Sequence, residues 1–243
     1  MELILDIGNT RTKYATFSNG LLESKGYCSD NELDAVIDTH IGLVKKVLVS
    51  SVKPLSNERE ISFKKMSSNV LFLNSKLKTP FTNDYETPKT VGSDRLALAA
   101  GALLIYPKKA ILIIDIGTCM TFDFVSDKGN YIGGAISPGL QMRLKALHQF
   151  TGKLPLVAVN EPQDLIGRNT IESILSGVVN GMKAEIDGII DVYKLRYPQV
   201  KIILTGGDIA FFDKKLKNSI FADADILLKG MHFILEHNSD ENN

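Results

Sequence analysis

Two stretches of the chain share one pattern, "LILDIGNTRTKY" (residues 3–14) and "LIIDIGTCMTFDF" (residues 112–124). Each is an apolar run followed by Asp-Ile-Gly and polar residues. Behind each copy come a β-rich run, a glycine-containing turn and a second run, and Gly20 and Gly129 stand equally far behind Asp6 and Asp115. Such a run, turn and run is typical of a β-hairpin. The repetition therefore predicts a chain built from two similar halves.

Helical and strand patterns alternate behind both copies. The first half continues with "DNELDAVIDTH", "KKVLVSS" and "VLFL", and the second with "ESILSGVVNGMKAEIDGIIDVYKL", "VKIILTG" and "ADILL". This alternation predicts an α/β fold with two halves of similar order. We place the border near residues 107–110, so that the predicted domains are residues 1–109 and 110–243.

Composition narrows the class of ligand. The 243 residues are 44% hydrophobic, and 28 basic residues balance 28 acidic ones, so no net field attracts nucleic acid or an anionic membrane. Cys28 and Cys119 are the only cysteines and form no CxxC pair, which fits a reducing cytoplasm. We expect a cytoplasmic protein with a small ligand, no export signal and no membrane span.

An Asp-x-Gly sequence at the end of a buried strand suits phosphate binding. Glycine allows a tight turn in which amide N–H groups face an oxyanion, and Asn9 and Thr118 add side-chain donors. The aspartate itself repels phosphate unless a cation intervenes, so Asp6 and Asp115 are candidate metal ligands. One such loop is usually only an Asx-type turn. Two copies with matching turns favour a phosphate clamp.

The paired loops, with a later "LTGGD", resemble the actin and sugar-kinase superfamily. That resemblance implies two duplicated ribonuclease-H-like (actin-like ATPase) domains, each a mixed sheet flanked by helices, with ATP in the cleft between them. Further motifs in the same order resemble the type III pantothenate kinase family: "YETPKTVGSDRLALAAGA", "IDIGTCMTFDFV", "GGAISPGLQMRLKAL" and "GRNTIESILSGVVNG". The resemblance implies ATP-dependent phosphorylation of pantothenate, the first step of coenzyme A synthesis.

Asp94 stands where a helix is expected to begin, because apolar residues and alanine follow until Pro107. An aspartate there is a good N-cap, and the sequence alone favours that role. In the family, however, the aspartate of Gly-x-Asp-Arg is the catalytic base, so the resemblance implies that Asp94 accepts the hydroxyl proton of pantothenate. Arg95 either binds substrate or forms an ion pair.

The resemblance also implies the remaining site residues. Tyr85 and Thr170 contact substrate, and Thr170 does so in the neighbouring subunit of a homodimer, although a threonine at a helix start is usually a cap. Asp115 holds a monovalent cation, K⁺ or NH₄⁺, and Asp6 is a possible ligand of the Mg²⁺ that accompanies ATP. The residues expected to bind ATP or its phosphates are Asp6, Gly8, Asn9, Thr10, Lys13 and Thr118, and those expected to bind substrate are Tyr85, Gly92, Ser93, Asp94, Arg95 and Thr170.

Two other functions compete with the kinase. One is a different phosphotransferase or nucleotide hydrolase of the same superfamily. The other is a non-catalytic accessory factor for transcription, because some relatives of the family are described in that way. A degenerate regulator is expected to lose Asp94 or one phosphate loop, and this chain keeps both.

Overall fold

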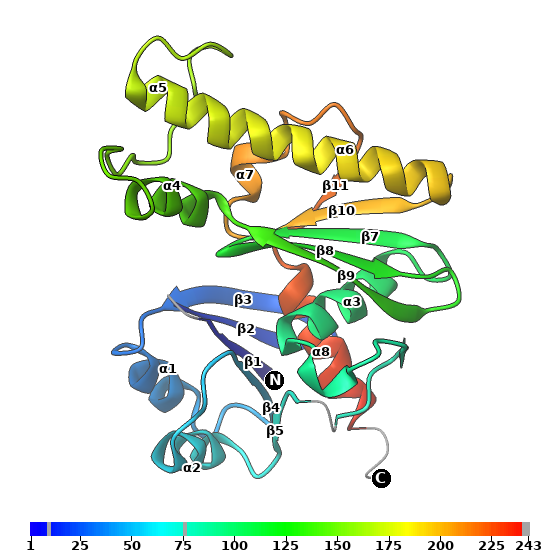
Figure 1. Cartoon of the computed structure of the whole chain (residues 1–243). Helices are drawn as coiled ribbons and strands as arrows, with labels where there is room; N and C mark the ends of the chain where they lie inside the picture. The colour runs from blue at the N-terminus through cyan, green and yellow to red at the C-terminus, as the bar shows by residue number, and fades with distance from the viewer. Residues whose placement is uncertain (9–10, 75–76, 240–243) are drawn as a thin grey trace. The chain divides into compact units, whose positions relative to one another are not determined.

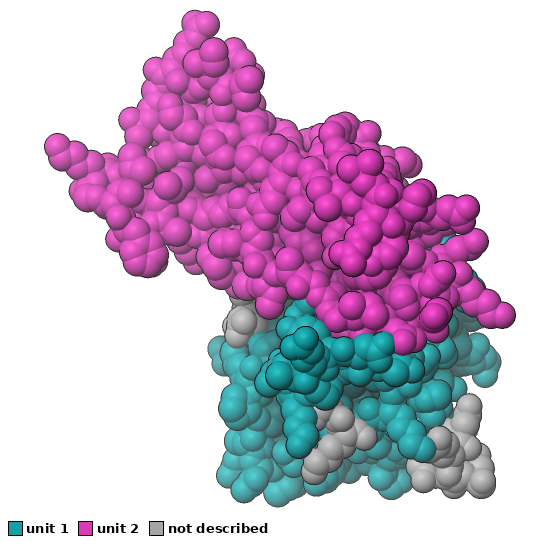
Figure 2. Space-filling view, turned by 45° about the vertical axis from the view of Figure 1, so that its right-hand side comes forward, with its two compact units in different colours: residues 1–107, 225–243 teal, residues 108–224 magenta. Residues whose placement is uncertain are grey.

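The computed structural model describes residues 1–8, 11–74 and 77–239, and the chain divides into two units. Unit 1 comprises residues 1–107 and 225–243, and unit 2 comprises residues 108–224 (Figure 2). The first border falls close to the one expected from the sequence. The C-terminal helix α8 (Ile226–His237) differs from that expectation, because it belongs to unit 1.

Unit 1 is built on a five-stranded sheet of order β3-β2-β1-β4-β5 (Figure 1). Strand β1 runs antiparallel to β2 and parallel to β4, and the hairpin from β2 to β3 turns at Asn19 and Gly20, as the sequence predicts. The strands are β1 (Glu2–Ile7), β2 (Thr12–Ser18), β3 (Leu21–Cys28), β4 (Lys46–Ser51) and β5 (Val70–Phe72).

Helices cover both faces of this sheet. Leu3 and Leu5 pack with α1 (Leu33–His40) and α2 (Asn57–Met66) on one face. Helices α3 (Ser93–Ile105) and α8 contact the strands from the other face, where Ile4 and Leu48 are fully buried. Two short elements, β6 (Thr82–Asn83) and a 3₁₀ turn (Pro88–Thr90), precede α3. Because both faces are covered, successive residues of β1 are apolar rather than alternating with polar ones.

Unit 2 repeats this arrangement. Its strands follow the order β9-β8-β7-β10-β11, with β8 and β9 forming the predicted hairpin and β10 parallel to β7. They are β7 (Ile111–Ile116), β8 (Cys119–Val125), β9 (Asn130–Pro138), β10 (Lys201–Thr205) and β11 (Phe221–Ala222). The same strand order in both units confirms the duplicated α/β fold with two mixed sheets flanked by helices.

The helices of unit 2 pack on one face of β7 and β8. Leu112, Ile114 and Phe122 form a core with residues of α4 and α6. The helices are α4 (Leu140–Gln149), α5 (Thr170–Leu175), a π-helical turn (Ser176–Asn180), α6 (Gly181–Arg196) and α7 (Ile209–Phe212). In the described part of the chain, no helix has both the length and the apolar character to cross a membrane.

Helix α8 belongs to unit 1 because two glycines let it approach α3 closely. A Cβ on Gly230 would lie 1.8 Å from the backbone oxygen of Ala97, and one on Gly101 would lie 2.3 Å from that of Ile226. Leu227, Met231 and Leu235 of α8 are buried. The last helix of the chain thus completes the core of the first unit.

We expect Gly230→Ala to lower the free energy of unfolding by about 3 kcal/mol, because the two helices must separate to admit one methyl group. Urea denaturation measures this change. The matched control is Gly188→Ala in α6, where an added Cβ meets no atom within 4 Å. This control should gain up to about 1 kcal/mol from the better helix propensity of alanine. Equal stability of the two variants would contradict the close contact.

Candidate active site

The carboxyl end of β1 is the centre of the candidate site. In the sheet, Asp6 is paired with Lys13 of β2 on one side and with Ser50 of β4 on the other. Helix α3 begins beside this edge, where the Ser93 hydroxyl lies 3.0 Å from the Ser50 hydroxyl. Four elements of unit 1 therefore bring polar side chains to the end of β1.

The first Asp-x-Gly loop follows β1 directly. The Gly8 amide donates a hydrogen bond to the Arg11 carbonyl at 3.2 Å. Asn9 and Thr10, both expected to bind phosphate, lie outside the described residues.

Asp6 is a buried carboxyl group with only 8% of its surface exposed. The pKa of Asp6 is raised from 3.8 to about 6, mainly by burial and also by the charge of Asp94, whereas Lys13 and Ser50 act to lower it. Asp6 and Asp94 are thus close enough to interact electrostatically. A nearby cation favours the ionised form of Asp6.

Asp94 is the second residue of α3, and the N-cap position is taken by Gly92. The reading of Asp94 as an N-cap is therefore wrong. Its Oδ1 instead accepts a hydrogen bond from the Arg95 amide at 2.8 Å. A Cβ on Gly92 would lie 2.4 Å from Asp94 Oδ1, so the glycine leaves the space that this carboxylate occupies. Asp94 therefore lies in the first turn of the helix, at its N-terminal end.

Arg95 and Tyr85, two of the expected substrate residues, lie together in unit 1. The guanidinium carbon of Arg95 is 5.8 Å from the centre of the Tyr85 ring, within the range of a cation–π contact. Arg95 is 7% exposed. The segment before α3 therefore contributes an aromatic group, Tyr85, that contacts the cationic group of Arg95, the residue next to Asp94 in the sequence.

The second Asp-x-Gly loop ends β7 in unit 2. Asp115 is paired with Thr121 of β8 and Thr205 of β10, and Thr118 is exposed. The Gly139 amide donates to the Thr118 carbonyl at 3.2 Å. This loop offers a partly exposed carboxylate and a hydroxyl on a short turn.

Two glycines hold the backbone close around this second loop. A Cβ on Gly139 would lie 2.1 Å from the Gly117 carbonyl oxygen. Gly206 has a φ of +108°, and its Cβ would lie 2.5 Å from Asp115 Oδ1. The paired glycines of "LTGGD" are recognisable in the sequence, but Gly139 is not. Gly139 follows β9, and only the fold shows that its backbone packs against Gly117 and Thr118. Neither position has room for a side chain.

Thr170 is the first residue of α5, and the N-cap is Asn169, whose side chain accepts from the Glu172 amide at 2.9 Å. The capping role considered for Thr170 is therefore wrong, and its exposed hydroxyl is not used to begin the helix. A π-helical turn at residues 176–180 follows in the same helical run. Such turns are frequent at functional sites.

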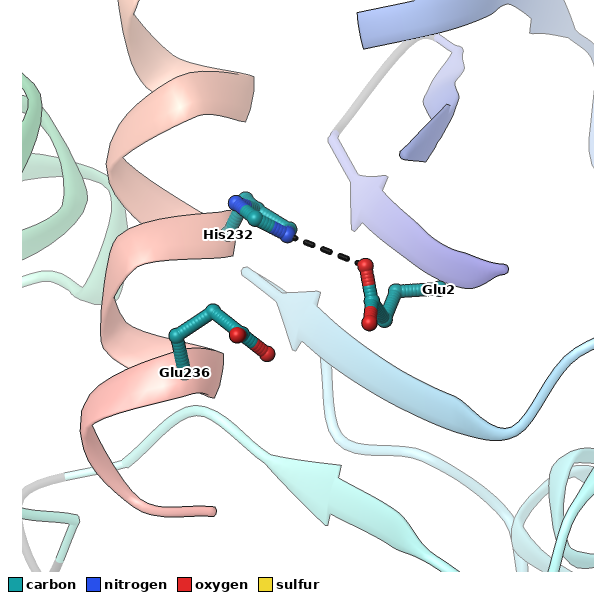
Figure 3. Close-up of side chains that lie close together, drawn as sticks. All are labelled: Glu2, His232 and Glu236. Atoms are coloured by element: carbon teal, nitrogen blue, oxygen red, sulfur yellow. Dashed lines mark hydrogen bonds and ion pairs between the residues drawn. The ribbon is translucent and has the colours of Figure 1, made fainter. Parts of the chain in front are cut away.

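Glu2, His232 and Glu236 form a group of metal-ligand type at the opposite end of β1 (Figure 3). His232 Nε2 lies 3.2 Å from a Glu2 oxygen, and the Lys46 ammonium lies 2.9 Å from Glu236. The ring of Phe17 stacks on His232 at 4.2 Å. The sequence around His232 has no spacing typical of metal ligands, because the group combines Glu2 near the N-terminus with residues of the last helix. Because Glu236 already forms an ion pair with Lys46 of β4, we interpret the three residues as a polar contact between α8 and the sheet.

Comparison with solved structures identifies the class of fold as that of actin-like ATPases and sugar kinases. A Campylobacter jejuni protein described as a Baf family transcriptional activator matches 98% of this chain and 99% of its own (TM-score 0.66, 20% identity). An inorganic polyphosphate/ATP-glucomannokinase from Arthrobacter sp. strain KM matches 98% of each chain (TM-score 0.50, 12% identity). At these identities the likeness shows the fold alone.

Sequence comparison identifies the family. The model of the family "Type III pantothenate kinase" matches residues 2–192. A type III pantothenate kinase of Christiangramia forsetii is 43% identical over 244 residues, which cover 99% of this chain and all of the relative. The chain belongs to the type III pantothenate kinase family.

Proposed function

We propose that the end of β1 and the start of α3 form the phosphoryl-transfer site of this protein, with Asp94 as the base. As a member of its family the chain phosphorylates pantothenate with ATP, the first step of coenzyme A biosynthesis. The observation that carries the site assignment is the convergence of Asp6, Lys13 and Asp94 in one unit. Phosphoryl transfer depends mainly on positioning and on charge stabilisation, and this cluster offers both.

Each member of the cluster has a distinct task in the proposal. Asp94 orients the hydroxyl of pantothenate and accepts its proton as the oxygen attacks the γ-phosphorus. Lys13, paired with Asp6 across β1 and β2, neutralises phosphate charge. Tyr85 and Arg95 bind pantothenate beside the base. Their contact with each other supports a shared role in substrate binding.

The use of ATP by a kinase implies a divalent metal ion, and Asp6 fits its chemistry. Mg²⁺ prefers carboxylate oxygens, and a buried carboxyl group whose pKa is raised to about 6 is readily ionised by a nearby cation. When bound, the ion would offset the repulsion between Asp6 and the phosphates. Asp115 offers an oxygen ligand for the proposed monovalent cation, at a loop where Gly206 keeps side chains away.

ADP release by the purified protein tests the function. We expect turnover with Mg²⁺ and ATP that requires pantothenate and is at least about 10-fold faster in K⁺ than in Na⁺. Asp115→Asn should remove the difference between the two ions. ADP release indifferent to pantothenate would favour another kinase or hydrolase of the superfamily, and indifference to the ion would contradict only the monovalent site.

We further propose a homodimer in which Thr170 completes the site of the partner subunit. Large apolar side chains are exposed before and after Thr170, with Leu165 73%, Ile166 72% and Ile171 51% exposed. A second copy of the chain would cover them and bury apolar surface. The cytoplasmic location and the lack of binding to nucleic acid stay predictions from composition.

Mixing two inactive variants tests the shared site. If Asp94→Asn and Thr170→Ala act in different subunits of one site, each mixed dimer contains one intact site. After subunit exchange, an equal mixture should recover about a quarter of the wild-type rate. Sedimentation measures the dimer separately. A mixture as inactive as its components, in spite of exchange, would contradict the contribution of Thr170 to the partner.

A further inference from the structure

Ser50 is a fully buried serine at the end of β4, and no sequence pattern drew attention to it. Its Oγ lies 3.0 Å from the Ser93 Oγ at the start of α3, and Ser50 is paired with Asp6 in the parallel alignment of β4 with β1. A buried hydroxyl is costly unless its hydrogen bonds are satisfied. Both of its partners belong to the proposed phosphoryl-transfer site.

Three elements meet at Ser50. Either serine can donate the proton of the Ser50–Ser93 hydrogen bond, because a hydroxyl both donates and accepts. The pairing of β1 with β4 sets Asp6 beside Ser50. The result is a connection from the first turn of α3 through β4 to the end of β1.

We propose that Ser50 is a positioning residue that holds the start of α3, and with it Asp94, against the first Asp-x-Gly loop. The inference rests on the proposed function of that site. Asp94 and Asp6 lie on elements that are distant in the sequence. Ser50 is paired with Asp6 in the sheet and is hydrogen-bonded to Ser93 in the first turn of the helix that carries Asp94. Because the reaction depends on the alignment of the reacting groups, a small displacement of Asp94 should lower kcat more than it weakens substrate binding.

A double-mutant cycle of Ser50→Ala and Ser93→Ala tests this role. We expect Ser50→Ala to lower kcat about 10- to 100-fold and to change the KM values for ATP and pantothenate less than about 3-fold. The double variant should be no slower than Ser50→Ala within about 2-fold, because both substitutions break the same chain. Independent losses that multiply would overturn the proposal.

A matched control is a second hydroxyl pair in the same sheet. Thr16 Oγ1 lies 2.7 Å from Ser24 Oγ in β2 and β3, so Ser24→Ala removes a bond of the same kind. The control should keep kcat within about 2-fold of the wild type. A kcat of Ser50→Ala equally close to the wild type would also overturn the proposal.

Two further measurements distinguish a failure of the Ser50 proposal from misfolding of the variant and from failure of the proposed function. If Ser50→Ala does not fold, Ser50→Cys, which keeps the volume but hydrogen-bonds weakly, takes its place with the same expectation. If the wild-type protein itself shows no pantothenate-dependent ADP release, the proposed function fails before any variant is made. A loss in Ser50→Ala beside an active wild type therefore reports on Ser50 alone.

Discussion

Asp94→Asn should lower pantothenate-dependent ADP release about 10³-fold, because the amide cannot accept the hydroxyl proton of the substrate. The amide oxygen can still accept the bond from the Arg95 amide, so the first turn of α3 is expected to stay in place. Steady-state kinetics with saturating ATP measure the loss. The KM for pantothenate should change little, since the substitution keeps the shape of the side chain.

The matched control for this experiment is Asp34→Asn. Asp34 is the second residue of α1, as Asp94 is of α3, and its carboxylate is exposed and paired with Arg59. The control should keep nearly the full rate, because it lies outside the proposed site. If Asp94→Asn retained more than about a tenth of the wild-type rate, Asp94 would not be the base, although the family assignment would stand.

Asp6→Asn should stabilise the ligand-free protein at neutral pH and abolish its activity. The pKa of Asp6 is raised from 3.8 to about 6 in the folded protein, so the protonated form is the one that folding favours. Its contribution to stability is therefore present below pH 3.8 and is lost as the pH rises through 6. The loss amounts to about 3 kcal/mol, at 1.36 kcal/mol per pKa unit.

Urea denaturation of both proteins at several pH values measures this effect. The stability of the wild type relative to Asp6→Asn should fall by about 2 kcal/mol between pH 4 and pH 7, since only the wild type carries the buried charge. A difference that does not change with pH would show that the Asp6 carboxyl group is not destabilised by burial. Loss of activity in the more stable variant would identify Asp6 as a residue kept for function at a cost in stability.

Local patterns predicted much of the fold correctly. The apolar runs that end at Asp6 and Asp115 form the central strands β1 and β7. The glycine-containing turns correctly predicted the positions of both hairpins. The helix expected to begin around Asp94 begins at Ser93. These features depend on residues that are neighbours in the chain, and periodicity and turn chemistry report such contacts well.

Helix caps and the domain border were predicted less well. The sequence allowed Asp94 and Thr170 to be caps, but Gly92 and Asn169 occupy those positions. A shift of one or two residues decides which side chain caps, and propensity does not resolve it. The predicted second domain, residues 110–243, includes α8, whereas α8 belongs to unit 1. The position of α8 depends on its close contact with α3 through Gly101 and Gly230.

The sequence by itself determined the duplicated halves, the position of both Asp-x-Gly loops and the family. Only the tertiary structure decided that Ser50 joins Asp6 to the start of α3 and that α8 completes unit 1. The physical reason is the parallel pairing of β1 with β4, which sets Asp6 beside Ser50 although a helix and two strands separate them in the chain. Contacts of this kind depend on strand order and register, which no local pattern encodes.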